Sequence, residues 1–84
     1  MEINYSLLPE HMQEGMKLYI ENGIPPGDFL LAVLENNLME AFGRADSINR
    51  YALFDFCQFL YNKAPPQCYG SPDKVAEWLN KKGD

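Results

Sequence analysis

Side chains with catalytic or metal-binding chemistry are few in this chain of 84 residues. The single histidine, His11, lies beside Glu10 and three positions before Glu14, and these three residues are the only local cluster of candidate metal ligands. Adjacent residues such as Glu10 and His11 point in different directions on a helix, which does not suit a shared metal ion. The chain has no HExxH or CxxC motif, no glycine-rich phosphate loop and no serine elbow. The sequence therefore predicts that the protein is not an enzyme and holds no metal ion and no cofactor.

A second group of residues suits binding rather than catalysis. Arg50, Phe54 and Tyr61 have the spacing i, i+4 and i+11, which places them on one side of a helix. A guanidinium beside aromatic rings suits a planar anionic ligand such as a nucleotide, because it can both stack and donate two hydrogen bonds. Tyr and Arg are also enriched at the centres of protein interfaces. The predicted site, for a partner or a ligand, consists of Arg50, Tyr51, Phe54, Asp55, Gln58 and Tyr61.

The element that must position this site is the largely apolar stretch from Tyr51 to Tyr61, YALFDFCQFLY. Wound as a helix, it has a core face formed by Ala52, Leu53, Phe56, Cys57, Phe59 and Leu60. The opposite face is polar but carries three aromatic rings, and it consists of Arg50, Tyr51, Phe54, Asp55, Gln58, Tyr61 and Asn62. Two alternatives stay open for the three rings. They are either buried against other segments of the same chain or left exposed for a partner.

Proline, glycine and capping residues divide the chain into short helices. Pro9 suits a helix start and Gly23 a left-handed helix end, which predicts a helix over 9–22. Further helices are predicted over 28–42, 47–63 and 72–82, with Asp46 or Ser47 and then Ser71 as N-caps. The predicted fold class is all-α, a small bundle of about four helices with short Pro/Gly connectors. An N-terminal arm over residues 1–8 precedes a single helical domain over residues 9–84.

The helix predicted over 28–42 also has more apolar residues than one core face requires. Its broad core arc consists of Leu30, Leu31, Leu34, Leu38, Ala41 and Phe42. Phe29 and Val33 fall on the other side, among polar residues. A second copy of the chain would cover this surplus and that of the 47–63 helix, and it would enlarge the small core of so short a chain. A homo-oligomer is therefore one expectation.

Charge and composition narrow the classes of partner. The formal net charge is −5 and the pI about 4.7. Binding to duplex nucleic acid requires a dense Lys/Arg surface, so no direct nucleic-acid contact is expected. An acidic mimic of nucleic acid ranks third among the functions considered, because the carboxylates are scattered along the chain. No apolar run reaches the length of a membrane span, so no membrane association is expected.

The two cysteines do not form a disulfide framework. Cys57 is placed on the core face as a small apolar residue, and Cys68 in a loop as a free thiol. Free thiols and the absence of a visible signal segment predict a cytosolic protein.

Three segments of the chain carry a family resemblance: PEHMQEGMKLYIENGIPPGDFLLAVLENNL (Pro9–Leu38), AFGRADSINRYALFDFCQFLYNKAP (Ala41–Pro65) and CYGSPDKVAEWL (Cys68–Leu79). In these segments the chain resembles a family of small accessory proteins encoded by tailed phages and prophages. The resemblance implies a phage accessory protein located in the cytoplasm of the host bacterium. It implies no particular activity and no particular binding residues.

Three functions follow as hypotheses. In the first, the aromatic helical face binds and inhibits a host protein, for example one that defends against phages. In the second, Arg50 and the same aromatic residues, with Arg44 and Lys63, line a pocket that sequesters a nucleotide-like immune signal. In the third, the chain is an acidic mimic of nucleic acid. The predicted partner is thus a host protein or a nucleotide-like small molecule.

Overall fold

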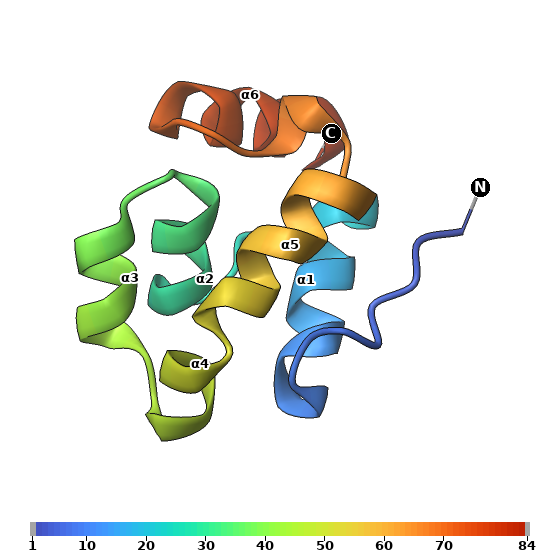
Figure 1. The fold of residues 1–84 in the computed structure, drawn as a ribbon. Helices are drawn as coiled ribbons and strands as arrows, with labels where there is room; N and C mark the ends of the chain where they lie inside the picture. Colours follow the sequence, from blue (N-terminus) through green and yellow to red (C-terminus); the bar gives the residue numbers. More distant parts are fainter. Residues whose placement is uncertain (1, 84) are drawn as a thin grey trace.

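The computed structural model describes residues 2–83, so Met1 and Asp84, which the predicted arm and domain include, lie outside the described residues. Within this range the chain is helical and contains no strand (Figure 1). The elements are α1 (Glu10–Asn22), α2 (Asp28–Leu34), α3 (Leu38–Arg44), α4 (Ser47–Tyr51), α5 (Leu53–Lys63), the 3₁₀ turn η1 (Pro66–Cys68) and α6 (Pro72–Gly83). The all-α class is confirmed. The described residues form six α-helices, however, where about four were predicted.

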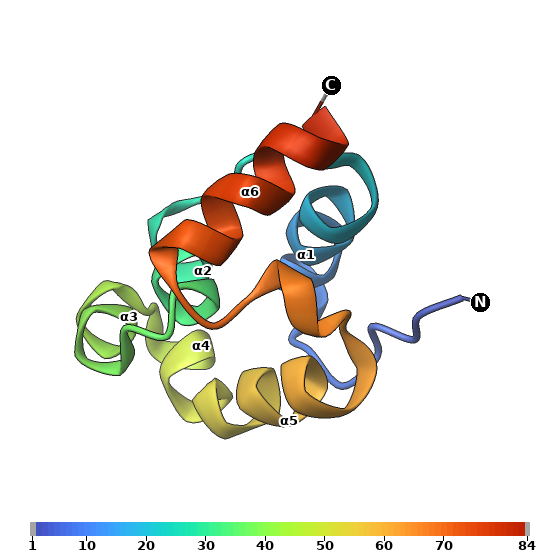
Figure 2. The ribbon, with the colours of Figure 1, turned by 90° about the horizontal axis from the view of Figure 1, so that it is seen from above.

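The helix predicted over 28–42 is broken into α2 and α3. Asn36 adopts a left-handed conformation with φ of 65°. The next residue, Asn37, then caps α3, because its side-chain oxygen accepts a hydrogen bond from the backbone N–H of Glu40 at 3.2 Å. The two asparagines therefore form a turn, and α2 and α3 pack side by side as a helical hairpin (Figures 1 and 2).

This turn also changes which side chains of the segment are buried. The predicted arc placed Leu38 and Phe42 in the core and Phe29 outside it. The structure shows the reverse: Phe29 is buried, while Leu38 and Phe42 are exposed. Leu38 and Phe42 leave the core because an arc drawn across an unbroken helix loses its register once Asn36 turns the chain. Phe29, which precedes the turn, is buried because its ring packs against Phe56 on α5.

The helix predicted over 47–63 is also interrupted. Ala52 (φ −95°, ψ 7°) ends α4 and precedes α5. Its backbone N–H is shared between the carbonyls of Ile48 (3.1 Å) and Asn49 (3.2 Å), the bifurcated arrangement common at helix ends. Alanine itself favours helix, so this interruption has no local cause in the sequence.

Three predicted helix boundaries are confirmed. Gly23 has φ of 68° and donates its N–H to the carbonyl of Tyr19 at 3.0 Å, which closes α1 with a left-handed cap. Asp46 accepts from the N–H of Asn49 at 2.7 Å, and Ser71 from that of Lys74 at 3.2 Å. Asp46 and Ser71 are N-caps, and each satisfies a backbone N–H that the first turn of its helix leaves free.

The core lies where α1, α2, α5 and α6 face one another, with α3 at the edge of the molecule (Figure 2). The ring of Phe56 on α5 meets that of Phe29 on α2 edge-on, with centroids 5.1 Å apart. Trp78 fastens α6 to α1, because its indole N–H donates to the carbonyl of Tyr19 at 3.2 Å. The Tyr19 hydroxyl in turn donates to the carbonyl of Cys68 at 2.6 Å, and burial raises the pKa of that phenol.

The N-terminal segment is not helical, and its second half forms a turn before α1, in which the N–H of Leu8 donates to the carbonyl of Tyr5 at 3.1 Å (Figure 1). Leu8 is buried, and the ring of Tyr5 lies 5.3 Å from that of Phe59 on α5. The Tyr5 hydroxyl donates to Glu21 on α1 at 2.9 Å. The described part of the arm is therefore packed on the helical core. No helix among residues 2–83 combines the length and the apolar character that a membrane span requires.

The two cysteines lie in unexpected environments. Cys57, predicted on the core face, is exposed, because it lies at the edge of the buried face of α5 that carries Phe56 and Leu60. Cys68 is fully buried, and this burial raises the pKa of its thiol to about 11.

We expect the two thiols to react at very different rates with iodoacetamide at pH 8. Cys57 is accessible and should be labelled first, whereas Cys68 is buried and protonated and should react only after unfolding. Intact mass should therefore show one added label on the native protein and two in denaturant. Two rapid labels on the native protein would contradict the buried position of Cys68.

Candidate functional site

Three aromatic side chains of α4 and α5 project from the molecule. Tyr51 is 90% exposed, Phe54 71% and Tyr61 82%. The buried alternative considered for these rings is therefore wrong. The arm and α2 pack instead on the opposite side of α5, where Phe56 and Phe59 contact Phe29 and Tyr5. We call Tyr51, Phe54 and Tyr61 the aromatic face.

Other large apolar side chains are exposed on the neighbouring helices, namely Leu38, Met39 and Phe42 on α3 and Ile48 on α4. An aromatic side chain presents about 150–250 Å² of surface, so the three rings of the aromatic face alone expose on the order of 500 Å². A standard interface buries about 800 Å² on each partner, of which the three rings would supply a large part.

A groove of about 450 Å³ runs beside the aromatic face. Its lining residues are Val33, Asn36, Phe54, Cys57, Gln58, Leu60, Tyr61, Asn62, Tyr69 and Gly70. One wall comes from α5 and the other from the end of α2 and the turn before α6. The N–H of Gly70 donates to the carbonyl of Leu34 at 2.8 Å, which fixes this second wall against α2.

The groove contains no charged side chain among the lining residues of the described chain. Asparagine, glutamine and tyrosine supply its polar atoms, and apolar groups supply the rest. A groove of this kind suits an uncharged or apolar group, oriented by a few hydrogen bonds.

The structure divides the predicted site residues into two groups. Phe54, Gln58 and Tyr61 line the groove together. Arg50, Tyr51 and Asp55 are not among its lining residues, although Tyr51 belongs to the aromatic face and Asp55 is half-buried at the start of α5. The predicted site is therefore a surface that spans two helices rather than one enclosed pocket.

Arg50 lies apart from the groove. Its guanidinium carbon is 5.1 Å from the centre of the Phe42 ring, and one of its nitrogens is 3.4 Å from the carbonyl of Ala45. These contacts join α4 to α3. Both side chains are exposed, so the cation–π contact lies at the surface of the molecule.

Several residues of the groove could not be assigned to it from the sequence. Tyr69 and Gly70 are far from α5 in the chain, and Val33 and Asn36 belong to a helix whose break went unpredicted. The surplus of Val33 was visible as an apolar residue on a polar arc, but nothing in the sequence indicates that it faces Phe54 and Tyr61.

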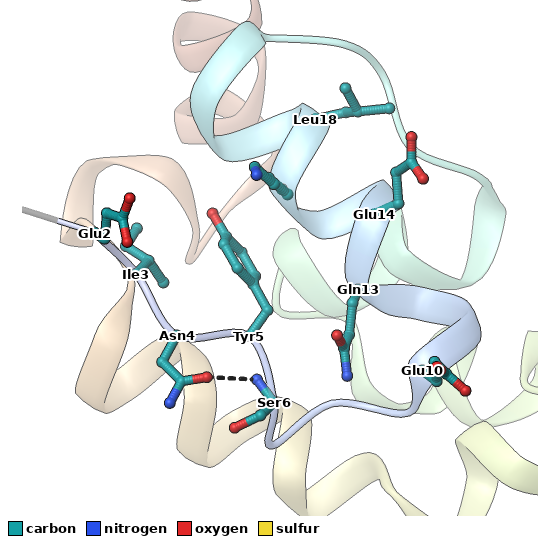
Figure 3. A pocket seen from close by; sticks show the side chains of 10 residues that line it. Glu2, Ile3, Asn4, Tyr5, Ser6, Glu10, Gln13, Glu14 and Leu18 are labelled. Atoms are coloured by element: carbon teal, nitrogen blue, oxygen red, sulfur yellow. Dashed lines mark hydrogen bonds between the residues drawn. The ribbon is translucent and has the colours of Figure 1, made fainter.

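A larger hollow, of about 1010 Å³, lies elsewhere, between the N-terminal arm and α1 (Figure 3). Its lining includes Glu2, Glu10 and Glu14 and the apolar groups of Ile3 and Leu18. Asn4 accepts from the N–H of Ser6 at 2.9 Å, which bends the arm over this hollow (Figure 3).

His11, one of the three candidate metal ligands named from the sequence, has a carboxylate partner outside that group. The Nε2 atom of His11 lies 3.0 Å from an oxygen of Asp46 on the connector between α3 and α4. Among residues 2–83 no group of three His, Cys, Asp or Glu side chains is placed to hold a metal ion. No hydroxyl or thiol of these residues hydrogen-bonds to His11.

Comparison of the chain with protein-family models, with curated proteins and with solved structures finds no match.

Proposed function

We propose that the chain is a non-enzymatic interaction protein that binds a partner protein through the aromatic face and the adjoining groove. The observation that carries this proposal is the exposure of Tyr51, Phe54 and Tyr61 on two consecutive helices. A partner that covers these rings removes their apolar surface from water, which is favourable, and Tyr is enriched at interface hot spots. The occupant we propose for the groove is an apolar segment of the partner, because no charged residue lines it.

The partner we propose is a host protein, which the chain would inhibit as a phage accessory protein in the bacterial cytoplasm. This part of the proposal rests on the family resemblance of Pro9–Leu79. A defence protein is one such target. Inhibition would follow if the chain covers a surface that the host protein needs for its own activity.

Two alternatives have less support. Sequestration of a nucleotide-like signal requires a cation beside the aromatic rings, but the groove lining is uncharged and Arg50 stacks on Phe42 instead. An acidic mimic requires free carboxylates in an array. Asp28 and Glu40 are paired with Arg44, and Asp46 with His11, so these acids are engaged within the chain.

Replacing Phe54 and Tyr61 together by serine should remove partner binding without unfolding the chain. Hot-spot residues contribute about 2 kcal/mol each, so affinity should fall by at least about 100-fold. Because both side chains are exposed, the free energy of unfolding should change by less than about 1 kcal/mol. The measurement is capture of a partner from host extract with the tagged chain, followed by a binding titration of the two purified proteins.

The matched control is the double variant Leu7→Ser with Ile24→Ser. Both residues are exposed apolar side chains outside the aromatic face and the groove, so the variant makes the same kind of change elsewhere. It should bind the purified partner as the unmodified chain does. If the Phe54/Tyr61 variant also binds normally, the proposed interaction surface is wrong. If native mass spectrometry shows a stable dimer that the Phe54/Tyr61 variant loses and the control variant keeps, the partner of this surface would be a second copy of the chain and not a host protein.

A further inference from the structure

A second cleft, of about 390 Å³, lies between α1, the connector before α2, and α4. It shares no lining residue with the groove beside the aromatic face. Its floor is apolar and includes Met12, Phe29 and Leu30, with the side-chain-free Gly15 opposite Leu30. Its polar groups come from His11, Asp28, Arg44, Asp46 and Asn49. A cleft of this size with an apolar floor and a few convergent polar groups has the form of a small-ligand site.

Asn49 is the unusual residue of this cleft. Its side chain is the only buried polar one in the described chain, at 3% exposure, and it lines the cleft. Its Oδ1 atom has no hydrogen-bond partner among residues 2–83. Buried amide oxygens are nearly always satisfied. This oxygen is shielded from solvent, and a turn of the amide about its last side-chain bond exchanges the oxygen with the nitrogen, which would present the oxygen to a donor that enters the cleft.

Carboxylates outnumber guanidinium groups among the side chains that line the cleft. The one guanidinium, that of Arg44, is shared by two carboxylates, Asp28 and Glu40, at 2.8 Å each. The other carboxylate of the lining, Asp46, accepts a hydrogen bond from the backbone N–H of Asn49 at 2.7 Å and has as its only side-chain partner among residues 2–83 the imidazole of His11, which is charged only when protonated. The backbone N–H of Asn49 holds the pKa of Asp46 below its usual range, so this carboxylate is ionised at neutral pH.

We propose that this cleft binds a planar, donor-rich cation of the guanidinium or amidinium class. The flat apolar faces of such a group match the floor formed by Met12, Phe29 and Leu30. Its N–H donors match the amide oxygen of Asn49 and the carboxylates of Asp28 and Asp46. A free small cation and the arginine side chain of another protein share this chemistry.

The test is an NMR titration of the full chain with benzamidine, with neutral benzamide and anionic benzoate as isosteric controls. The side-chain amide of Asn49 and the backbone amides of Met12 and Gly27 should shift. Benzamidine should bind at least tenfold more tightly than benzamide, and benzoate should not bind. Equal binding of benzamidine and benzamide, or shifts confined to other residues, would overturn the proposal and leave Asn49 as a hydrated amide.

Charge removal supplies an independent variant. The double variant Asp28→Asn with Asp46→Asn should weaken benzamidine at least tenfold, and the asparagine at position 46 can still cap α4. The control, Asp73→Asn with Glu77→Gln, removes the same charge from exposed positions on α6 and should leave the affinity unchanged. An equal loss in both variants would show an effect of net charge alone and would overturn the site.

A second ligand, N-acetyl-arginine methylamide, distinguishes an arginine side chain of another protein from a free small cation. Shifts at the same resonances would support an arginine side chain of another protein as the occupant. Binding of benzamidine without binding of the capped arginine would support a free small cation. The aromatic face takes no part in this site, so the Phe54/Tyr61 variant should bind benzamidine normally.

Discussion

Replacing Phe56 by alanine should remove most of the stability of this protein. The ring is fully buried and packs edge-on against Phe29, at the contact between α5 and α2. Truncation of such a ring costs about 3–5 kcal/mol, because it leaves a cavity as well as removing apolar contact. Small domains have only about 5–15 kcal/mol to lose. The melting temperature should therefore fall by about 15 °C or more, as measured by thermal unfolding followed by circular dichroism.

The same substitution two residues earlier provides the control. Phe54 is a phenylalanine on the same helix, but it is 71% exposed. Phe54→Ala should change the free energy of unfolding by no more than about 0.5 kcal/mol. Similar losses at Phe56 and Phe54 would mean that the orientation of α5 is wrong.

The second large effect is expected at Gly23, which closes α1. Its φ of +68° is strained for any residue with a side chain. A Cβ atom at this position would also lie 2.5 Å from the backbone nitrogen of Gly83 and 2.6 Å from Cβ of Lys82, at the end of α6. Gly23→Ala should therefore cost about 2 kcal/mol or more, because backbone strain and displacement of α6 add together.

Gly43 is the matched control for this prediction. It lies inside α3, one residue beyond the helix predicted over 28–42, and a Cβ atom there would meet nothing within 4 Å. Gly43→Ala should stabilise the protein by up to about 1 kcal/mol, because alanine favours helix and restricts the unfolded chain. Denaturant unfolding of both variants should give changes of opposite sign. A stabilising effect at Gly23 would contradict the close approach of α6 to the end of α1.

Helix ends were the most predictable part of the fold. Gly23, Asp46 and Ser71 act on the backbone within four residues, so their types and positions were sufficient. The break between α2 and α3 had a local signal in the two asparagines at 36 and 37. The apolar arc that continued to Phe42 outweighed it, and this arc was the source of the error. The break at Ala52 has no comparable signal, since alanine itself favours helix.

The candidate site was predictable only in part for a different reason. Periodicity along α5 correctly separated Phe56, Phe59 and Leu60 from Phe54 and Tyr61. It could not determine whether another segment covers the second group, because coverage depends on where the arm, α3 and α6 pack. The groove is built from segments as distant as Val33 and Tyr69, and the contact of Arg50 with Phe42 depends on the turn between α3 and α4.

The two proposed sites would serve different chemistry on one small chain. The aromatic face and groove suit an apolar protein segment, whereas the cleft at Asn49 suits a cation. They share no lining residues, so variants of one site leave the other intact and each can be tested separately.

The most direct test of the account is the solvent access of individual tyrosines, measured by photochemically induced nuclear polarisation on the monomeric chain. Tyr51 and Tyr61 should give strong signals, while the buried Tyr19 and Trp78 should give none. Addition of the partner protein should suppress both strong signals. Absence of the Tyr51 and Tyr61 signals from the free monomer, or their persistence in the saturated complex, would contradict an exposed aromatic face that a partner covers.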